Sequence, residues 1–115
     1  MSEYDVVLHV DKPDNSLAIA FTNAVNYAKA LPGEHFSMVL VVNSAAVTLL
    51  KRGNKEIAGA LEEAVASGLS VRVCNNALES TRTDPEEMYP QCVVIPPGLV
   101  EIVRLQRKGY AYIKP

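Results

Sequence analysis

Short apolar runs, separated by polar and turn-prone segments, divide this chain of 115 residues. Unbroken runs of β-branched and aliphatic residues are typical of strands that are buried on both faces of a sheet. Five segments fit a strand pattern: residues 6–10, 36–42, 69–73, 92–95 and 110–113. The sequence therefore predicts a sheet of five short strands.

Between the predicted strands, apolar residues recur every three or four positions, which is the spacing of an amphipathic helix. The pattern is clearest over residues 17–31, where Pro32 and Gly33 end the helix. Ser44 is expected to cap a short helix that ends near Gly53. Further helical stretches are predicted between Asn54 and Gly68, after Asn75 or Asn76, from Asp84 through Tyr89, and between Leu99 and Gly109.

This alternation of strands and helical segments indicates the fold class. Right-handed crossovers join parallel strands and place helices on both faces of the sheet. The predicted fold is α/β, a three-layer sandwich with a mainly parallel five-stranded sheet. The sequence has no internal repeat or low-complexity segment, so residues 1–115 are expected to form a single domain.

The composition excludes several classes of protein. Thirteen acidic and eleven basic residues give a formal charge of −2, too balanced for binding to nucleic acid or a membrane surface through bulk electrostatics. No apolar run approaches the roughly 20 residues of a membrane span, and the acidic segment 1–5 does not resemble a secretory signal. We expect a soluble, cytoplasmic protein with no direct nucleic-acid partner and no membrane contact.

A functional site in an open parallel sheet lies outside the carboxyl ends of the strands. Four loops qualify: residues 9–15, 43–44, 74–76 and 96–98. These loops contain no glycine-rich phosphate-binding motif, and the first is acidic where an anion would bind. The histidines and cysteines do not have the spacing of a zinc motif. We therefore expect no nucleotide, flavin or other cofactor, and no metal.

Cys74 is the candidate catalytic residue, because it follows the third predicted strand and precedes a helix. If Asn75 caps that helix, the sulfur lies beside unpaired N–H groups and the positive end of the helix dipole, and both favour a thiolate. A thiolate can act as a nucleophile or accept a sulfur atom. A cysteine at a strand end can also be a small buried hydrophobic residue, and position alone leaves both interpretations open.

Cys92 lies at the start of the fourth predicted strand, which is the opposite end of a parallel sheet from Cys74. With a rise of about 3.3 Å per residue, the two α-carbons should lie beyond the limit of about 7 Å for a disulfide. We expect two free thiols, with Cys92 packed in the core.

Four polar residues are candidates for binding or supporting roles around Cys74. His9 is near the end of the first predicted strand, where it could donate a proton or favour the Cys74 thiolate as a cation; it could also be a hydrogen-bonded core histidine. Asn43, Asn75 and Asn76 offer amide donors, although asparagine also suits turns and helix caps.

Several segments resemble the DsrE/DsrF-like family. They are VLHVD at residues 7–11, VRVCNNAL at 71–78, VVIPPGLVEIVRLQ at 93–106 and GYAYIKP at 109–115. The resemblance covers essentially the whole chain and is strongest over the C-terminal third. It implies a compact α/β fold with a parallel sheet and assembly into a homotrimer or hexamer.

The resemblance also implies a function. Relatives in sulfur oxidation and transfer-RNA thiolation carry a persulfide on a cysteine just after the third strand and pass its sulfur to another protein. Cys74 matches that cysteine, whereas Cys92 matches no motif position. We therefore expect an intracellular sulfur carrier or sulfurtransferase-like protein, with sulfur donor and acceptor proteins as partners. The alternative is a non-catalytic oligomeric module that binds a small ligand or a protein.

Overall fold

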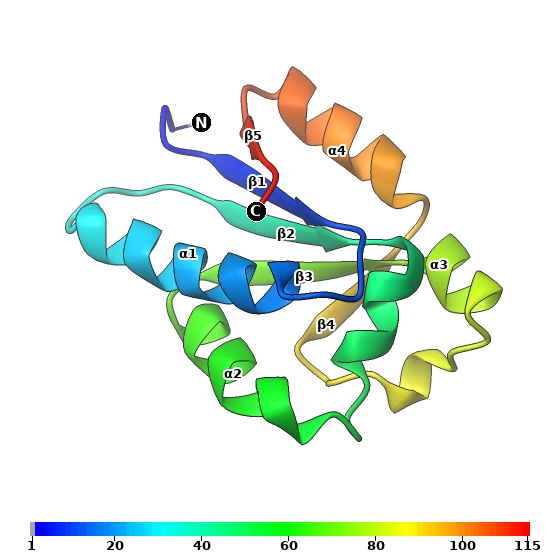
Figure 1. The fold of residues 1–115 in the computed structure, drawn as a ribbon. Coiled ribbons are helices and arrows are strands. Elements are labelled where there is room, and N and C mark those ends of the chain that lie inside the picture. The colour runs from blue at the N-terminus through cyan, green and yellow to red at the C-terminus, as the bar shows by residue number, and fades with distance from the viewer. Residues whose placement is uncertain (1) are drawn as a thin grey trace.

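A five-stranded parallel sheet forms the centre of the molecule (Figure 1). The computed structural model describes residues 2–115. The strands are β1 (Val6–Val10), β2 (Met38–Val42), β3 (Leu69–Cys74), β4 (Cys92–Ile95) and β5 (Ala111–Ile113). They lie in the order β4-β3-β2-β1-β5, and every neighbouring pair is parallel. The predicted α/β class is confirmed, and the sheet is entirely parallel.

Helices cover both faces of this sheet, as Figure 1 shows. The α-helices are α1 (Ser16–Ala30), α2 (Ala58–Ala66), α3 (Asn75–Ser80) and α4 (Gly98–Arg107), and the 3-10 helices are η1 (Ser44–Leu50), η2 (Lys55–Ile57) and η3 (Pro85–Glu87). Helices α1 and α2 lie on one face, α4 lies on the other, and α3 lies beyond the carboxyl ends of the strands. Between residues 2 and 115, no helix is long and apolar enough to span a membrane.

The hydrophobic core has two parts, one on each face of the sheet. The larger part lies under α1 and α2 and includes Phe21, Leu40 and Leu61. The smaller part lies under α4, where Ile102 and Leu105 pack on valines of β1 and β2. All residues of β1 and β2 are buried, because these two strands have neighbours on both sides and helices on both faces.

Two predicted caps are wrong. Cys74 itself is the N-cap of α3, and Asn75 and Asn76 are the first two residues of that helix. The reason is that β3 continues through Cys74, which pairs with Ile95 of β4. Ser44 does not cap η1; it is the first residue of that helix, with a φ of 52°.

The capping motif predicted at Asp84 is present. The Asp84 carboxylate accepts a hydrogen bond from the backbone N–H of Glu86, and the Glu87 carboxylate accepts one from the backbone N–H of Asp84. This reciprocal arrangement starts η3 at Pro85. Proline loses no hydrogen bond there, because the first N–H of a helix has no partner within the helix.

Candidate functional site

A pocket of about 340 Å³ opens at the carboxyl end of the sheet, beside the N-termini of η1, α3 and α4. It is lined by Asn43, Ser44, Cys74, Asn76, Ala77, Ser80, Pro97, Gly98 and Leu99. Six of these nine residues come from three of the four loops at which the sequence placed the site, and Ala77, Ser80 and Leu99 come from the helices that follow. All of them are uncharged, so hydrogen-bond donors and helix dipoles dominate the electrostatics of the pocket wall.

The Cys74 sulfur lies in this pocket and accepts one hydrogen bond. The backbone N–H of Gly98 donates a hydrogen bond to Sγ, with an N–S distance of 3.3 Å. Gly98 is the first residue of the ten-residue helix α4, so the sulfur lies at the positive end of that helix. The side chain is almost fully buried, which opposes a charge on the sulfur, whereas the N–H donor and the positive end of the helix favour a negative charge there.

Gly98 makes this contact possible because it has no side chain. A Cβ at this position would lie 3.1 Å from Val41 Cγ1 and 3.3 Å from Cys74 Cβ. Both distances are shorter than ordinary van der Waals contact, so a Cβ here would push its neighbours away by a few tenths of an ångström, which glycine avoids. Gly98 lies in one of the four predicted site loops, but nothing in the sequence indicates this contact with Cys74.

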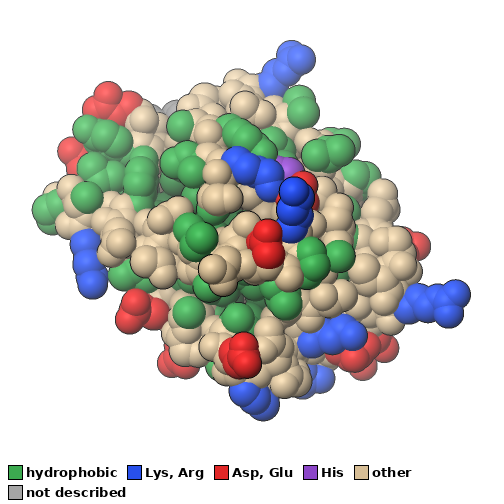
Figure 2. Space-filling view, in the orientation of Figure 1, with side chains coloured by type: hydrophobic (Ala, Val, Ile, Leu, Met, Phe, Trp, Pro, Cys, Tyr) green, Lys and Arg blue, Asp and Glu red, His purple; other side chains and the backbone are tan. Residues whose placement is uncertain are grey.

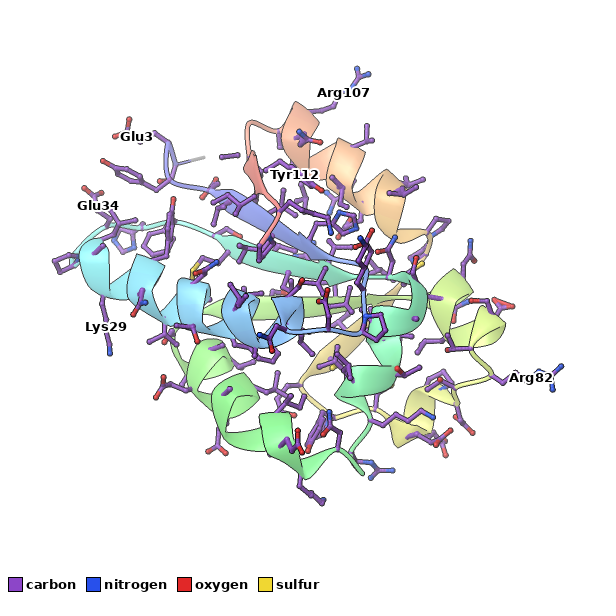
Figure 3. The ribbon with its side chains drawn as sticks, in the orientation of Figure 1. Glu3, Lys29, Glu34, Arg82, Arg107 and Tyr112 are labelled. Atoms are coloured by element: carbon purple, nitrogen blue, oxygen red, sulfur yellow. The ribbon has the colours of Figure 1, made fainter. Side chains whose placement is uncertain are left out.

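His9 lies behind the pocket wall rather than in the pocket. Its ring is buried, with Nδ1 2.7 Å from the Tyr112 hydroxyl and Nε2 2.9 Å from Asn43 Oδ1. Tyr112, labelled in Figure 3, comes from the edge strand β5. Since Oδ1 can only accept, Nε2 carries the proton of the second bond. His9 therefore reaches the pocket through Asn43.

The predicted asparagines separate into two groups. Asn43 and Asn76 line the pocket. Asn75 does not, because its Nδ2 donates to Glu79 Oε1 one turn along α3, at 3.0 Å. The structure thus brings together Cys74, Asn43 and Asn76, with His9 behind them and Asn75 outside.

Ser44 and Ser80 also line the pocket and were not predicted as site residues. Ser44 has a φ of 52°, in the left-handed region that non-glycine residues seldom adopt. Such a backbone conformation persists where the surrounding structure fixes it. The sign of φ at Ser44 could not be predicted from the sequence. The position of Ser44 was the available signal, because it comes directly after Asn43 at the end of β2.

Cys92 lies at the far end of β4. It pairs in register with Val71, whereas Cys74 pairs with Ile95, so the two cysteines are at opposite ends of adjacent strands. Both are free thiols. Burial raises the pKa of the Cys92 thiol to about 11, so it is protonated at neutral pH. Cys92 is partly buried and packs against the larger core.

A second cavity lies outside this pocket. A cavity of about 310 Å³ between α1, β1 and β5 is lined by mostly apolar residues, including Leu8 and Ile113, and by the amide side chains of Asn23 and Asn26. No cysteine, serine or lysine lines it. Within residues 2–115, no group of three or more histidine, cysteine or acidic side chains is arranged to hold a metal ion.

Neither a protein-family sequence model nor a curated protein sequence matches the chain. Solved structures do match it. The protein of unknown function MTH1491 from Methanobacterium thermoautotrophicum is 30% identical, with a TM-score of 0.87; the match covers 97% of this chain and 99% of that protein.

Two more distant structures share the fold. The YchN protein from E. coli is 18% identical with a TM-score of 0.81, over 97% of this chain and 99% of that one. The conserved protein of unknown function BT1422 from Bacteroides thetaiotaomicron is 15% identical with a TM-score of 0.67, over 95% and 94% of the two chains. The chain therefore belongs to the family of MTH1491 and has the YchN/DsrE-like fold.

Proposed function

We propose that this protein is a sulfur carrier in which Cys74 holds a persulfide and passes the terminal sulfur to a partner thiol. One observation supports this proposal most strongly. The Cys74 sulfur lies in a pocket and accepts a hydrogen bond from the N–H at the start of α4. This environment suits a sulfur atom that carries negative charge in part of its cycle.

Two thiol-exchange steps complete the cycle. In the first, the Cys74 thiolate attacks the terminal sulfur of a donor persulfide, R–S–SH. A new S–S bond forms, the donor S–S bond breaks, and the donor leaves as the thiolate R–S⁻. In the second, an acceptor thiolate attacks the terminal sulfur of the Cys74 persulfide, and Cys74 leaves as a thiolate. Sulfur and charge are conserved in both steps, so no external oxidant or reductant takes part.

The pocket supports this chemistry by its size and by its lining. A volume of about 340 Å³ accommodates a small polysulfide or the end of a partner's cysteine side chain. The Gly98 N–H lies where it stabilises the Cys74 sulfur as attacking group and as leaving group. The pocket is therefore suited to holding the sulfur in both forms.

The proposal includes protein partners. The outer face of α4, formed by Leu99, Val100 and Val103, is 52–63% exposed, and Leu99 also lines the pocket. Figure 2 shows hydrophobic side chains at the surface over this helix. A second copy of the chain or a sulfur acceptor that covers this face would lie beside the mouth of the pocket. We propose that the functional form of the protein is a homo-oligomer, either a trimer or a hexamer.

A second candidate function is a non-catalytic module that binds a small ligand. The cavity between α1 and β5 favours it, since about 310 Å³ of mostly apolar space with two amide groups is typical of a small-molecule site. Under this alternative, Cys74→Ala leaves binding unchanged.

Mass spectrometry of the intact protein after incubation with polysulfide tests the proposed function. The wild type and Cys92→Ser, the matched control, should each gain the mass of sulfur that a reducing agent then removes. Cys74→Ser should gain none. The proposal is wrong if Cys74→Ser gains sulfur as readily as the wild type, or if the wild type gains none.

A further inference from the structure

Asn43 is held from behind by a buried histidine. Its Oδ1 accepts the Nε2–H of His9 at 2.9 Å, and the other ring nitrogen of His9 lies 2.7 Å from the Tyr112 hydroxyl. The imidazole is only 7% exposed and is tilted against the Tyr112 ring, with 5.8 Å between the ring centroids. The contacts on both nitrogens and the neighbouring Tyr112 ring leave the imidazole little freedom to turn.

This bond determines which part of the Asn43 amide is left for a ligand. Because Oδ1 is occupied by His9, the Nδ2–H₂ group is the free part of the amide, and no residue among 2–115 accepts a hydrogen bond from it. Asn43 lines the Cys74 pocket. Beside it, the Gly98 N–H already points at the Cys74 sulfur. This wall of the pocket therefore presents hydrogen-bond donors.

The backbone of Asn43 and Ser44 holds this wall of the pocket in place. Asn43 N–H donates to the carbonyl of Val10, and the next residue, Ser44, has a φ of 52°. The space at Gly98 that a Cβ would fill is bordered by Asn43 Cβ at 3.5 Å and Cys74 Cβ at 3.3 Å. Asn43 and Cys74 thus flank one point, the start of α4.

We propose that His9 is a positioning residue that holds the Asn43 amide with its donors free, and that the pocket therefore prefers a negatively charged group beside Cys74 over a neutral group of the same size. The inference rests on the proposed function only in taking Cys74 as the reacting residue. It names the class of substrate: a sulfur compound whose reacting end carries negative charge before or after transfer. Neutral amide donors hold such a charge without the tight pairing that a lysine or arginine would impose.

Two alkylating reagents of nearly equal size measure this preference. Iodoacetate is anionic and iodoacetamide is neutral, and both react with the same thiolate, so the ratio of their rates does not depend on how much thiolate is present. The ratio at Cys74, followed by peptide mass spectrometry, is compared with the ratio for N-acetylcysteine amide, which has no pocket. We expect the iodoacetate to iodoacetamide ratio to be about tenfold higher at Cys74, the effect of one hydrogen bond to a charged group.

Variants separate the roles of the two residues. Asn43→Asp, which replaces the donor by a carboxylate, should bring the ratio below that of the free thiol. His9→Gln keeps a donor near the position of Nε2 and should retain most of the preference. His9→Phe frees the Asn43 amide and should abolish it. Tyr112→Phe, at a partly exposed position, removes one of the two bonds to His9 and should give an intermediate ratio even if His9→Phe does not fold.

A wild-type ratio equal to that of the free thiol overturns the charge preference. An unchanged ratio in His9→Phe, or in Tyr112→Phe if His9→Phe does not fold, overturns the positioning role. The result is independent of sulfur transfer: a charge preference without persulfide formation contradicts the proposed function alone, and persulfide formation without a charge preference contradicts this inference alone.

Discussion

Gly98 lets the start of α4 lie close to the Cys74 sulfur. Its N–H reaches Cys74 Sγ at 3.3 Å, and it brings no side chain into the narrow space between α4 and the end of β3. Cys74 and Asn43 could be located from the sequence because both follow the ends of predicted strands, where parallel sheets place their sites. The role of Gly98 could not, because the close approach is made through space, between segments 24 residues apart.

Replacing Gly98 by alanine should disturb the site. The added Cβ meets Val41 Cγ1 at 3.1 Å, so we expect a loss of about 1–3 kcal/mol in the free energy of unfolding, together with slower alkylation of Cys74. Chemical denaturation and alkylation kinetics measure the two effects. Gly59→Ala is the control, since nothing lies within 4 Å of its Cβ and alanine favours the helix. Equal effects of the two substitutions would contradict the packing argument.

Cys92 should make stability fall in alkali. Its pKa is raised by burial from 9.0 to about 11, so the folded state keeps the proton that the unfolded state releases. The stability that this provides is fully present below pH 9 and is lost as the pH rises toward 11. Relative to Cys92→Val, which does not ionise, the wild type should lose about 1 kcal/mol between pH 8 and pH 10. The free energy of unfolding of the two proteins is measured by denaturant unfolding across this pH range. If both lose the same stability, Cys92 does not cause the loss in alkali.

At the scale of elements, the five strands could be predicted because each is a short apolar or β-branched segment with clear breaks on both sides. The helix expected from residue 44 is instead the 3-10 helix η1, Ser44–Leu50. The cap at Asn75 was wrong because cap preference is a local property, whereas β3 is extended by its pairing with β4. The cap of η1 is Asn43, one residue before the predicted Ser44. Local signals therefore located the elements, and tertiary pairing decided where they end.

A charged cluster connects α4 to β3. Glu101 of α4 pairs with Arg72 of β3 and with Arg104 one turn along α4. Burial opposes ionisation of Glu101, but hydrogen bonds from the two arginines outweigh it and hold the pKa of the carboxyl below its ordinary value. This cluster fixes the helix whose first N–H contacts Cys74.

Removing the charge of Glu101 should weaken this connection in a pH-dependent way. Because the pKa is lower in the folded state, the carboxylate stabilises the protein at neutral pH, and this stability is lost as the pH falls from 4.5 through the lowered pKa. We expect Glu101→Gln to cost about 1 kcal/mol at pH 7, because Arg104 is half exposed and adds little. The difference from the wild type, measured by thermal unfolding, should shrink in acid. Glu62→Gln, at an exposed position on α2, is the control; a pH-independent difference for Glu101→Gln would contradict the assignment.

At the scale of the whole molecule, the formal charge of the chain is only −2, and the surface feature that stands out is the group of exposed apolar side chains on α4. Leu99, Val100 and Val103 lie together on one exposed face of the helix, beside the pocket. Apolar clusters of this kind mark interaction sites on soluble domains. The size of the assembly could not be predicted from local patterns in one chain, because it depends on the match between surfaces of separate copies.

We expect this face to be covered by another copy of the chain. Light scattering coupled to size exclusion should give a mass above that of the monomer, and Val100→Glu should reduce it by placing charge in the contact. Ile19→Glu, at a partly exposed position on α1 across the sheet, should leave the mass unchanged. A monomeric wild type, or dissociation by Ile19→Glu but not by Val100→Glu, would contradict this arrangement.

The central claim is that Cys74 receives a sulfur atom and gives it up. Peptide-level mass spectrometry of polysulfide-treated protein, before and after addition of an acceptor thiol, tests both halves at once. We predict one added sulfur on the peptide with Cys74, none on the peptide with Cys92, and its loss when the acceptor is added. Sulfur on Cys92 alone, or a sulfur on Cys74 that no thiol removes, would contradict the account.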